Sequence, residues 1–377
     1  MIESLVLALP PMIERLYVQN FRCLESLTLD LSDCSSALLV GRNGTGKSAI
    51  RSAMAVLQRI GRGSSRVGQL ISPSDFSFNR IDRPMRFELE ATVAGKRYQY
   101  DISFEWPDHF REARILDEKV SVDGINVFAR HHSQVRLGSE AEFGLDWHVF
   151  ALPVINDSPP TRSLQQLKDY LASIVLLTPI PRQMNGFSSQ PSVELVEDAS
   201  NFASCLRALF EKKPAAYGAF DEAIRELIPD FEAIENVERG KDGRQLMVTF
   251  GGPGGENSFT IEFDALSDGE KCFFIAAYLQ ASIAAGFPVV CMWDEPDNHL
   301  SMSEIGHLIA TLRRSSRRGG QFIATSHHPE TVRRFSDENT IVLTRRSHLD
   351  PTIPKLLSDI CYEGDLVDAM IRDEVVG

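Results

Sequence analysis

The sequence has 377 residues, 43% of them hydrophobic, and a formal net charge of −13. This length and hydrophobic content suffice for a sizeable core divided among two or three subdomains. The excess of 52 acidic over 39 basic residues argues against a protein that coats nucleic acid with its whole surface. A local basic patch could still bind DNA.

The cysteines and the apolar segments indicate a cytoplasmic protein that does not cross a membrane. None of the six cysteines belongs to a Cys-x-x-Cys pair, so neither a zinc framework nor a secreted disulfide scaffold is expected. No apolar run approaches the about 20 residues that a membrane helix needs. Residues 1–11 lack the basic start of a signal peptide and are expected to be an extension with little role.

The first predicted elements lead into and out of a glycine-rich loop. Residues 13–30 have the pattern of two short strands around a turn, and Ser36 to Val40 form a buried strand. A helix is expected to start at Ser48 and to end at Gly61, because the apolar residues between them recur on one helical face.

The remaining pattern changes from β-rich to alternating α/β along the chain. Hairpins are expected over 87–104, around Ala94-Gly95, and around Asp123-Gly124. The next predicted elements are an irregular segment over 131–163, helices near 164–173 and 201–235, and strands over 245–250 and 258–263. After Ser267 helices and strands alternate, which indicates an α/β fold. No heptads persist over three repeats, so no coiled-coil arm is expected.

The most specific motif is G-x-x-x-x-G-K-S, between the predicted strand and the predicted helix. Its glycines allow backbone N–H groups to face phosphates, and the helix start favours an anion. Lys47 is expected to reach the β- and γ-phosphates of ATP, and Ser48 to ligate Mg²⁺. The predicted cofactor-binding residues are Gly41, Arg42, Asn43, Gly44, Thr45, Gly46, Lys47 and Ser48.

A second motif follows an apolar strand that starts near Phe287 and ends in Asp294-Glu295. Alone, such a pair would indicate a solvated strand end. Downstream of a P-loop, Asp294 is expected to hold Mg²⁺ and Glu295 to polarise the attacking water. A third strand ends in His327-His328. A histidine there could be structural, but its place after the carboxylates favours His327 as a sensor of the γ-phosphate.

The segment Leu266-Ser-Asp-Gly-Glu-Lys271 opens the helix between these motifs. Ser267 and Glu270 have the spacing of a capping box, which alone would explain both residues. A capping box does not need Gly269, however, and a glycine at a helix start indicates that backbone N–H groups approach an anion. The P-loop already provides one phosphate-binding site in each chain. We therefore expect Ser267 and Gly269 to contact a second nucleotide, the one bound by a partner copy.

The order P-loop, LSDGEK, WDEP and ATSHHPE resembles the ABC-type ATPases of the RecF/SMC/OLD branch, and most closely the prokaryotic AAA-domain proteins with that head. The resemblance covers residues 13–60 and 260–345. It implies a two-lobed α/β head with a mixed insert, which closes on ATP as a homodimer with composite sites. In this sequence it implies a Walker A motif at 41–48, Walker B at 294–295 and a signature at 266–271.

The resemblance also implies three segments. These are an N-terminal part with the P-loop over 1–85, a β-rich and helical insert over 86–260, and a C-terminal lobe over 261–377. Two departures concern the details of the site. Leu300 is followed by Ser301-Met302 where the family usually has His-Pro, and the glutamine that couples the insert to Mg²⁺ has two candidates, Gln69 and Gln183.

Three functions are compatible with these motifs. The first is an ATP-driven regulator of a separate nuclease or toxin in antiphage defence, since the chain has a compact insert and no acidic nuclease cluster in its last residues. The second is a RecF-like DNA-repair ATPase, which the C-terminal arginines favour and the net charge disfavours. The third, a transporter subunit, is disfavoured by the LSDGEK signature and by the long β-rich insert.

Overall fold

The computed structural model describes residues 11–138, 141–156, 161–252, 257–335, 337–362, 364 and 368–369. The chain divides into two compact units. The first unit contains Met1–Ile174 and Ser336–Gly377, and the second contains Val175–Phe335. The three segments predicted from the sequence, 1–85, 86–260 and 261–377, remain a prediction about domain organisation.

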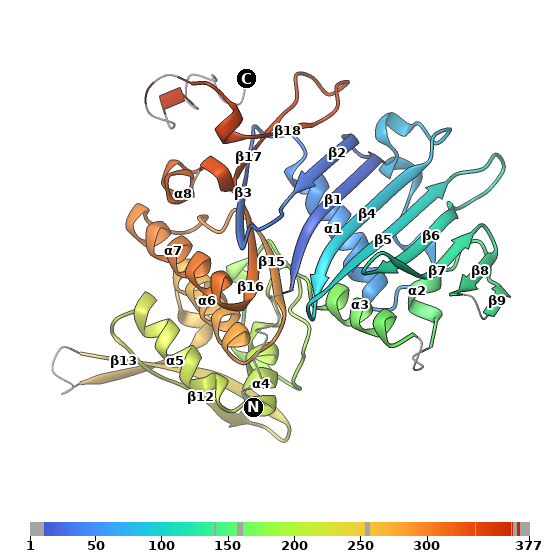
Figure 1. The fold of residues 1–377 in the computed structure, drawn as a ribbon. Helices are drawn as coiled ribbons and strands as arrows, with labels where there is room; N and C mark the ends of the chain where they lie inside the picture. The colour runs from blue at the N-terminus through green and yellow to red at the C-terminus, as the bar shows by residue number, and fades with distance from the viewer. Residues whose placement is uncertain are drawn as a thin grey trace, which may run out of the picture. The chain divides into compact units, whose positions relative to one another are not determined.

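The first unit contains an antiparallel eight-stranded sheet (Figure 1). In sheet order its strands are β2 (Leu24–Asp30), β1 (Met12–Phe21), β4 (Met85–Val93), β5 (Lys96–Glu105), β6 (Arg114–Val122), β7 (Ile125–His131), β8 (Gln134–Leu137) and β9 (Ala141–Gly144). Burial alternates along β4, as expected for a sheet with one covered face. Both predicted hairpins are confirmed, and each turn has two residues of positive φ, at Ala94-Gly95 and at Asp123-Gly124.

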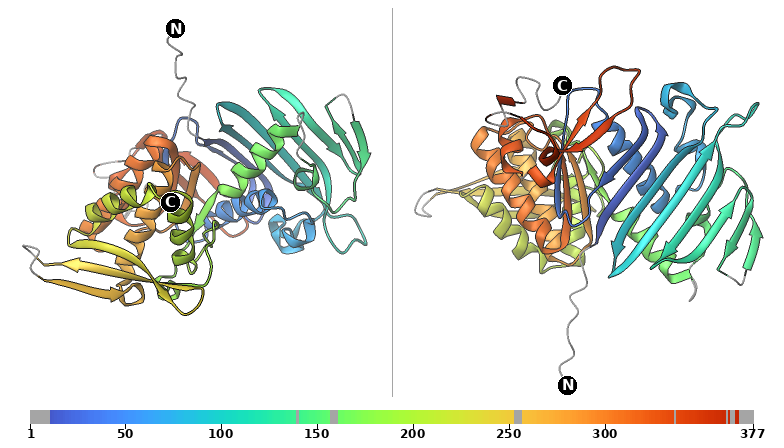
Figure 2. Two further views of the ribbon diagram at one scale, coloured as in Figure 1. Left: turned by 90° about the horizontal axis from the view of Figure 1, so that it is seen from below. Right: turned by 45° about the horizontal axis from the view of Figure 1, so that its top comes forward.

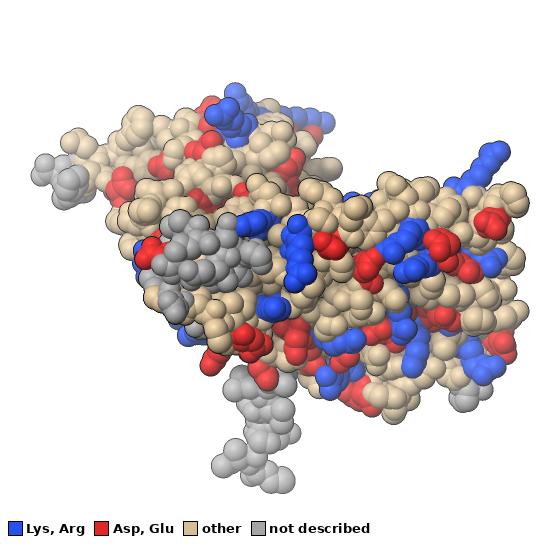
Figure 3. Space-filling view, turned by 90° about the horizontal axis from the view of Figure 1, so that it is seen from above, with Lys and Arg blue, Asp and Glu red and all other residues tan. Residues whose placement is uncertain are grey.

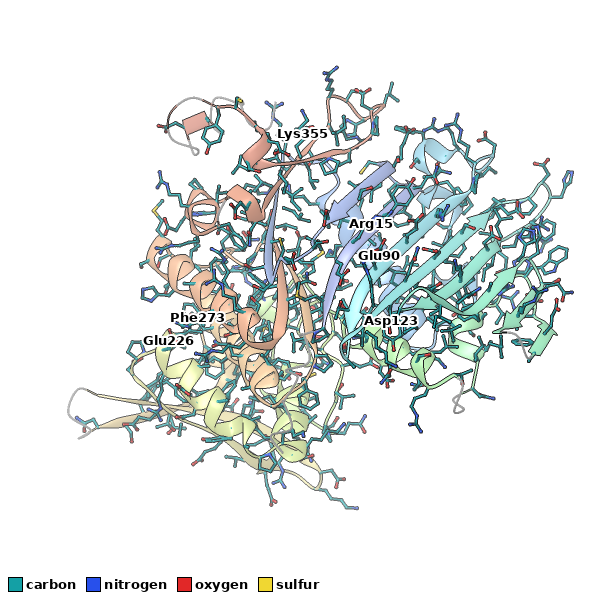
Figure 4. The ribbon with its side chains drawn as sticks, in the orientation of Figure 1. Arg15, Glu90, Asp123, Glu226, Phe273 and Lys355 are labelled. Carbon is teal, nitrogen blue, oxygen red and sulfur yellow. The ribbon has the colours of Figure 1, made fainter. Side chains whose placement is uncertain are left out.

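Charged side chains also connect the strands of this sheet. Arg15 on β1 donates to Glu88 at 2.8 Å and to Glu90 at 3.0 Å, both on β4 (Figure 4). On β6, the fully buried Glu118 accepts hydrogen bonds from the backbone N–H groups of Ala151 and Leu152, at 2.7 and 2.9 Å. These two bonds fix the start of the short helix α2 (Ala151–Val154) to the sheet.

The expectation that residues 131–163 are irregular is partly wrong. The segment contains β8, β9 and α2. The guanidinium of Arg130 on β7 donates to the carbonyls of His132, Asp146 and Val149, and so holds this segment against the sheet. The order of this segment therefore comes from a buried arginine in the preceding strand, which local sequence patterns do not reveal.

Helices cover one face of the eight-stranded sheet (Figure 2). Helix α1 (Lys47–Gly61), predicted to within one residue, packs against α3 (Arg162–Ser173). The contact is close at Gly61, where an added Cβ would lie 2.5 Å from Leu171 Cβ. The first unit also contains β3 (Ser36–Val40), β17 (Thr340–Thr344) and β18 (Ile353–Leu356). Strand β17 runs parallel to β3 and antiparallel to β18.

The second unit contains the predicted alternation of helices and strands. Its parallel strands are β10 (Val175–Leu177), β15 (Val289–Asp294) and β16 (Gly320–Thr325), and its helices in this region are α6 (Asp268–Ala284), α7 (Met302–Gly319) and α8 (Pro329–Arg334). The residues of β16 are all buried, and so are those of β15 as far as Trp293. Continuous burial is expected of parallel strands covered on both faces. The C-terminal ends of β15 and β16 consequently lie side by side.

A smaller antiparallel sheet completes the second unit. Its strands are β11 (Phe187–Ser188), β12 (Phe231–Arg239), β13 (Gly243–Gly251) and β14 (Ser258–Glu262), accompanied by α4 (Phe202–Lys212) and α5 (Ala216–Leu227). Glu226 of α5 and Phe273 of α6 mark the packed helix pair of this unit (Figure 4). The helix predicted to reach residue 235 is wrong, because Pro229 ends α5 and β12 follows.

None of the helices in the described ranges is long and apolar enough to cross a membrane. The longest helix that the structure describes is α7, with 18 residues, and no coiled-coil arm occurs in the described part of the chain.

Candidate functional site

The glycine-rich loop of the first unit connects β3 to α1 as predicted. Gly44 and Gly46 have φ values of 82° and 108°, a region that residues with a Cβ rarely adopt. Gly41 is required for a different reason, because an added Cβ would lie 2.5 Å from the carbonyl oxygen of Leu343 on β17. The three glycines therefore fix one compact loop conformation at the N-terminus of a 15-residue helix.

The carbonyl groups of this loop accept hydrogen bonds from protein donors. Lys47 Nζ donates to the carbonyl of Gly41 (2.6 Å), and Thr45 Oγ1 donates to that of Arg42 (2.8 Å). Arg345 Nη1 donates to the carbonyl of Gly44 (3.1 Å), and Thr352 Oγ1 donates to that of Thr45 (2.7 Å). The carbonyl of Gly46 accepts from the backbone N–H of Ile50 (2.9 Å). Backbone N–H and C=O groups point in roughly opposite directions in such a turn, so bonded carbonyls favour N–H groups directed at an anion.

Lys47 is the first residue of α1, and only 8% of it is exposed. Its ammonium group donates to the carbonyls of Gly41 at 2.6 Å and Arg42 at 3.3 Å. The P-loop carbonyls thus hold the cation at the loop. Ser48 follows on the first turn of α1 and is exposed.

In the second unit, Asp294 and Glu295 lie at the end of β15, beside the end of β16. The hydroxyl of Thr325 on β16 donates to Asp294 Oδ1 and also lies 3.1 Å from the backbone nitrogen of Glu295, from which it accepts. Glu295 has a φ of 51°, which turns the chain sharply after the strand. Thr325 therefore positions both carboxylate residues, a role that the sequence analysis missed.

The Glu295 carboxylate has a partner on each oxygen. Oε1 lies 2.6 Å from His327 Nε2, and Oε2 accepts a 2.9 Å hydrogen bond from Asn298 Nδ2. About a third of the Glu295 side chain and 43% of the His327 side chain are exposed, so solvent reaches this pair. The neighbouring His328 instead accepts from the backbone N–H of Glu330 at 3.2 Å and caps α8. The two adjacent histidines thus have distinct environments.

Ser267 is the N-cap of the 17-residue helix α6. The predicted capping box is confirmed, since Ser267 Oγ accepts from Glu270 N at 3.3 Å and Glu270 Oε2 accepts from Ser267 N at 2.7 Å. Gly269 has a packing reason as well. An added Cβ would lie 2.9 Å from the carbonyl oxygen of His299 and 3.1 Å from Leu300. The glycine therefore seats the loop after β15 against the start of α6, and an approaching phosphate is not needed to explain it.

Asp297 is a buried residue of this loop that the sequence analysis did not single out. It is 7% exposed and accepts hydrogen bonds from the hydroxyls of Ser326 and Thr331. Ser326 precedes His327, so Asp297 ties the loop after β15 to the loop after β16. The signal in the sequence was a third carboxylate, two residues beyond Glu295, next to a predicted strand end.

The unusual Leu300-Ser301-Met302 segment also has a structural explanation. Ser301 is the N-cap of α7, and its backbone N–H donates to Glu304 at 2.7 Å. Of the two glutamine candidates, Gln69 ends a short 3₁₀ helix of the first unit and Gln183 ends one of the second. The choice between them remains a prediction.

Comparison with solved structures shows the class of fold. A Smc head bound to the C-terminal winged-helix domain of ScpA has a TM-score of 0.55 and 17% sequence identity, over 92% of this chain and 98% of that one. The Smc head domain with an extended coiled coil, bound to the C-terminal domain of ScpA from Pyrococcus furiosus, has a TM-score of 0.54 and 15% identity, over 93% of this chain and 97% of that one. The protein therefore has the fold of an ABC-type P-loop ATPase head.

The family follows from the sequence profile described as "AAA domain, putative AbiEii toxin, Type IV TA system", which matches residues 36–333. The chain belongs to this family and is an ATP-binding ATPase. No curated protein matches the sequence significantly.

Proposed function

We propose that the protein binds Mg-ATP through the loop 41–48 and hydrolyses it with Glu295 as the general base. The observation that carries this proposal is the P-loop, whose carbonyls are engaged by protein donors while its helix start favours an anion. Lys47 leaves its carbonyl partners and pairs with the β- and γ-phosphates. Lys47→Ala should abolish ATP binding in calorimetry, and normal affinity would refute the assignment.

The donor atoms of Ser48 and Asp294 suit Mg²⁺. This ion prefers oxygen ligands and is usually held by one or two protein groups together with substrate phosphates and water. Thr325 donates to one oxygen of Asp294, which orients the carboxylate. When bound, the ion offsets the charge on the phosphate oxygens. Ser48→Ala and Asp294→Asn should each lower the Mg²⁺ dependence of ATP binding, measured by titrating Mg²⁺ at fixed nucleotide.

Glu295 would accept a proton from the attacking water through its half-exposed carboxylate. His327, 2.6 Å away, orients that carboxylate and can also turn to the γ-phosphate. Asn298 holds the second carboxylate oxygen and prevents free rotation of the group. The pair therefore combines a base with a residue that responds to the phosphate.

The active form is proposed to be a homodimer with two composite sites. Ser267 is exposed at the start of α6, and its hydroxyl can donate to a phosphate while its oxygen remains in the capping box. In the dimer, Ser267 and Gly269 contact the nucleotide held by the partner's P-loop.

A mixing experiment tests the composite site. Ser267→Arg should bind ATP but not hydrolyse it, because a bulky cation replaces the small hydroxyl at the phosphate. In a mixed dimer with Lys47→Ala, one site carries both changes and the other is intact, so activity should partly return. Normal hydrolysis by Ser267→Arg as a monomer would rule out the dimer. If mixed dimers demonstrably form but the mixture shows no ATPase activity, the two sites are strictly coupled or Ser267 does not act on the partner's nucleotide.

The biological role we propose is ATP-dependent control of a separate effector, a nuclease or toxin, in cytoplasmic antiphage defence. The family description, with its toxin–antitoxin reference, and the compact head support this role. Co-expression with neighbouring genes tests it. The Glu295→Gln variant should change the toxicity of a neighbouring effector during phage infection, and no effect from any neighbour would argue against control of an effector.

The alternative role is that of a RecF-like DNA-repair ATPase. The arginines of α7 favour it, but Arg314 pairs with Glu226 and Arg313 donates to the carbonyl of Arg334. Acidic and basic side chains are also interspersed over the face in Figure 3. Binding of duplex DNA that weakens steeply with salt and is lost in an Arg317→Glu/Arg318→Glu variant would favour this alternative.

A further inference from the structure

The loop between β17 and β18, residues 345–352, packs against the P-loop within the first unit. Strand β17 lies beside β3, which leads directly into the P-loop. Two side chains of the β17–β18 loop then reach P-loop carbonyls about 300 positions earlier in the chain, at Gly44 and Thr45. No motif of the family resemblance includes this loop.

Thr352 connects the P-loop to a second segment. It is 3% exposed, its hydroxyl donates to the carbonyl of Thr45 at 2.7 Å, and its backbone N–H donates to the carbonyl of Cys23 at 3.1 Å. An added Cβ at Gly46 would lie 2.7 Å from Thr352 Oγ1 and 3.0 Å from Cys23 Sγ. Thr352 and the turn between β1 and β2 therefore pack directly against the P-loop at Gly46.

Arg345 contributes a second, independent contact. Its guanidinium donates to the carbonyl of Gly44 at 3.1 Å, and also to those of His348 at 2.6 Å and Asp350 at 2.8 Å. One planar group thus shapes its own loop and holds the P-loop. Lysine has a single ammonium group and cannot reproduce this fork.

We propose that Arg345 and Thr352 are positioning residues of the nucleotide site, which hold the P-loop carbonyls so that its N–H groups face the phosphates of ATP. The role rests on the proposed nucleotide-binding function of the P-loop. The P-loop contacts the phosphates before and during the reaction. Loss of the Arg345 or the Thr352 contact should therefore weaken binding of the ground state and of the transition state equally. The expected signature is a raised KM with an unchanged kcat.

Matched variants separate this role from general stability. Thr352→Val has nearly the same shape but no hydroxyl, whereas Thr352→Ser keeps the donor. One lost hydrogen bond to a buried carbonyl should weaken ATP binding about fivefold in Thr352→Val. Thr352→Ser should bind as the wild type does. Arg345→Met should weaken binding at least as much, and Arg345→Lys should restore only part of it. Calorimetry and steady-state kinetics give Kd, KM and kcat, and the nucleotide-free thermal midpoint reports the structural cost.

Wild-type ATP affinity in both Thr352→Val and Arg345→Met would overturn the proposal, as would a fall in kcat with an unchanged KM. If Thr352→Val does not fold, Arg345→Met, whose site is half-buried, still provides the test. Lys47→Ala distinguishes failure of nucleotide binding by the P-loop from failure of the positioning role of Arg345 and Thr352. Normal ATP binding by Lys47→Ala would refute the nucleotide-binding function of the P-loop. If Lys47→Ala loses ATP binding while Thr352→Val and Arg345→Met keep wild-type affinity, only the role of the β17–β18 loop is refuted.

Discussion

Replacing Glu295 with glutamine tests the proposed catalytic base with little disturbance of its surroundings. The amide oxygen of the substituted side chain can accept from His327 Nε2, as Oε1 does now, and Asn298 can turn its amide to accept from the new NH₂ group. Asp294 keeps its bond from Thr325. The variant should therefore bind Mg-ATP with wild-type affinity.

The loss of turnover should be large, because an amide cannot accept the proton of the attacking water. General base catalysis contributes about 10²- to 10⁴-fold to a rate, or about 3–5 kcal/mol of transition-state stabilisation. We expect Glu295→Gln to lower the hydrolysis rate by a factor within that range. Undiminished binding with blocked turnover should also trap an ATP-dependent dimer, visible by size-exclusion chromatography with light scattering.

Single-turnover phosphate release, measured at saturating Mg-ATP, gives the chemical rate, and calorimetry gives the affinity. Asn298→Ala is the matched control, since it removes one hydrogen bond to the carboxylate but leaves the base; about a fivefold decrease is expected from one bond of about 1 kcal/mol. Hydrolysis by Glu295→Gln within a few-fold of the wild-type rate would show that another group activates the water.

Other changes test the surroundings of this pair and of the sheet. His327→Ala should lower turnover more than ATP affinity, whereas His328→Ala should lower only stability, because its ring caps α8; reversed effects in parallel assays would exchange their roles. Asp297→Asn should destabilise the protein by about 2 kcal/mol in urea unfolding, since a buried acceptor of two hydroxyls loses its charge; an unchanged midpoint would contradict this. Glu118→Ala should cost about 3–5 kcal/mol, because two backbone N–H groups lose their acceptor and the buried Arg130 loses its ion-pair partner; a cost below about 1 kcal/mol would contradict this.

The fold could be predicted where local chemistry decides it. Asp123-Gly124 marks a hairpin because both residues adopt positive φ, and the apolar run to Trp293 marks a buried parallel strand. The start of β12, from Phe231, falls within the helix predicted over 201–235 from the apolar spacing at its N-terminal end. The decisive signal was Pro229, which ends the preceding helix.

The motif residues of the site could also be predicted, because their spacing reflects local phosphate and cap geometry. Thr325, Asp297 and Thr352 could not, because each acts through a partner brought close by the fold: Thr325 across neighbouring strands, Asp297 across two loops, and Thr352 from the far end of the sequence. Gly269 shows a further limit. The sequence indicated one reason for a glycine, and the structure adds a second in the close approach of His299.

The bond from Thr352 to Thr45 spans 307 positions of the sequence, and β17 pairs with β3 over a similar separation. During synthesis the P-loop is made early, but the residues that complete its enclosure are made late. Contacts of such high sequence separation form slowly and only after the intervening chain exists. We expect that nascent chains that stop before residue 340 will not be retained on a resin that carries an immobilised nucleotide. Nucleotide capture would then report that β17 and Thr352 have been made, and a head without them could not enter an ATP-dependent assembly.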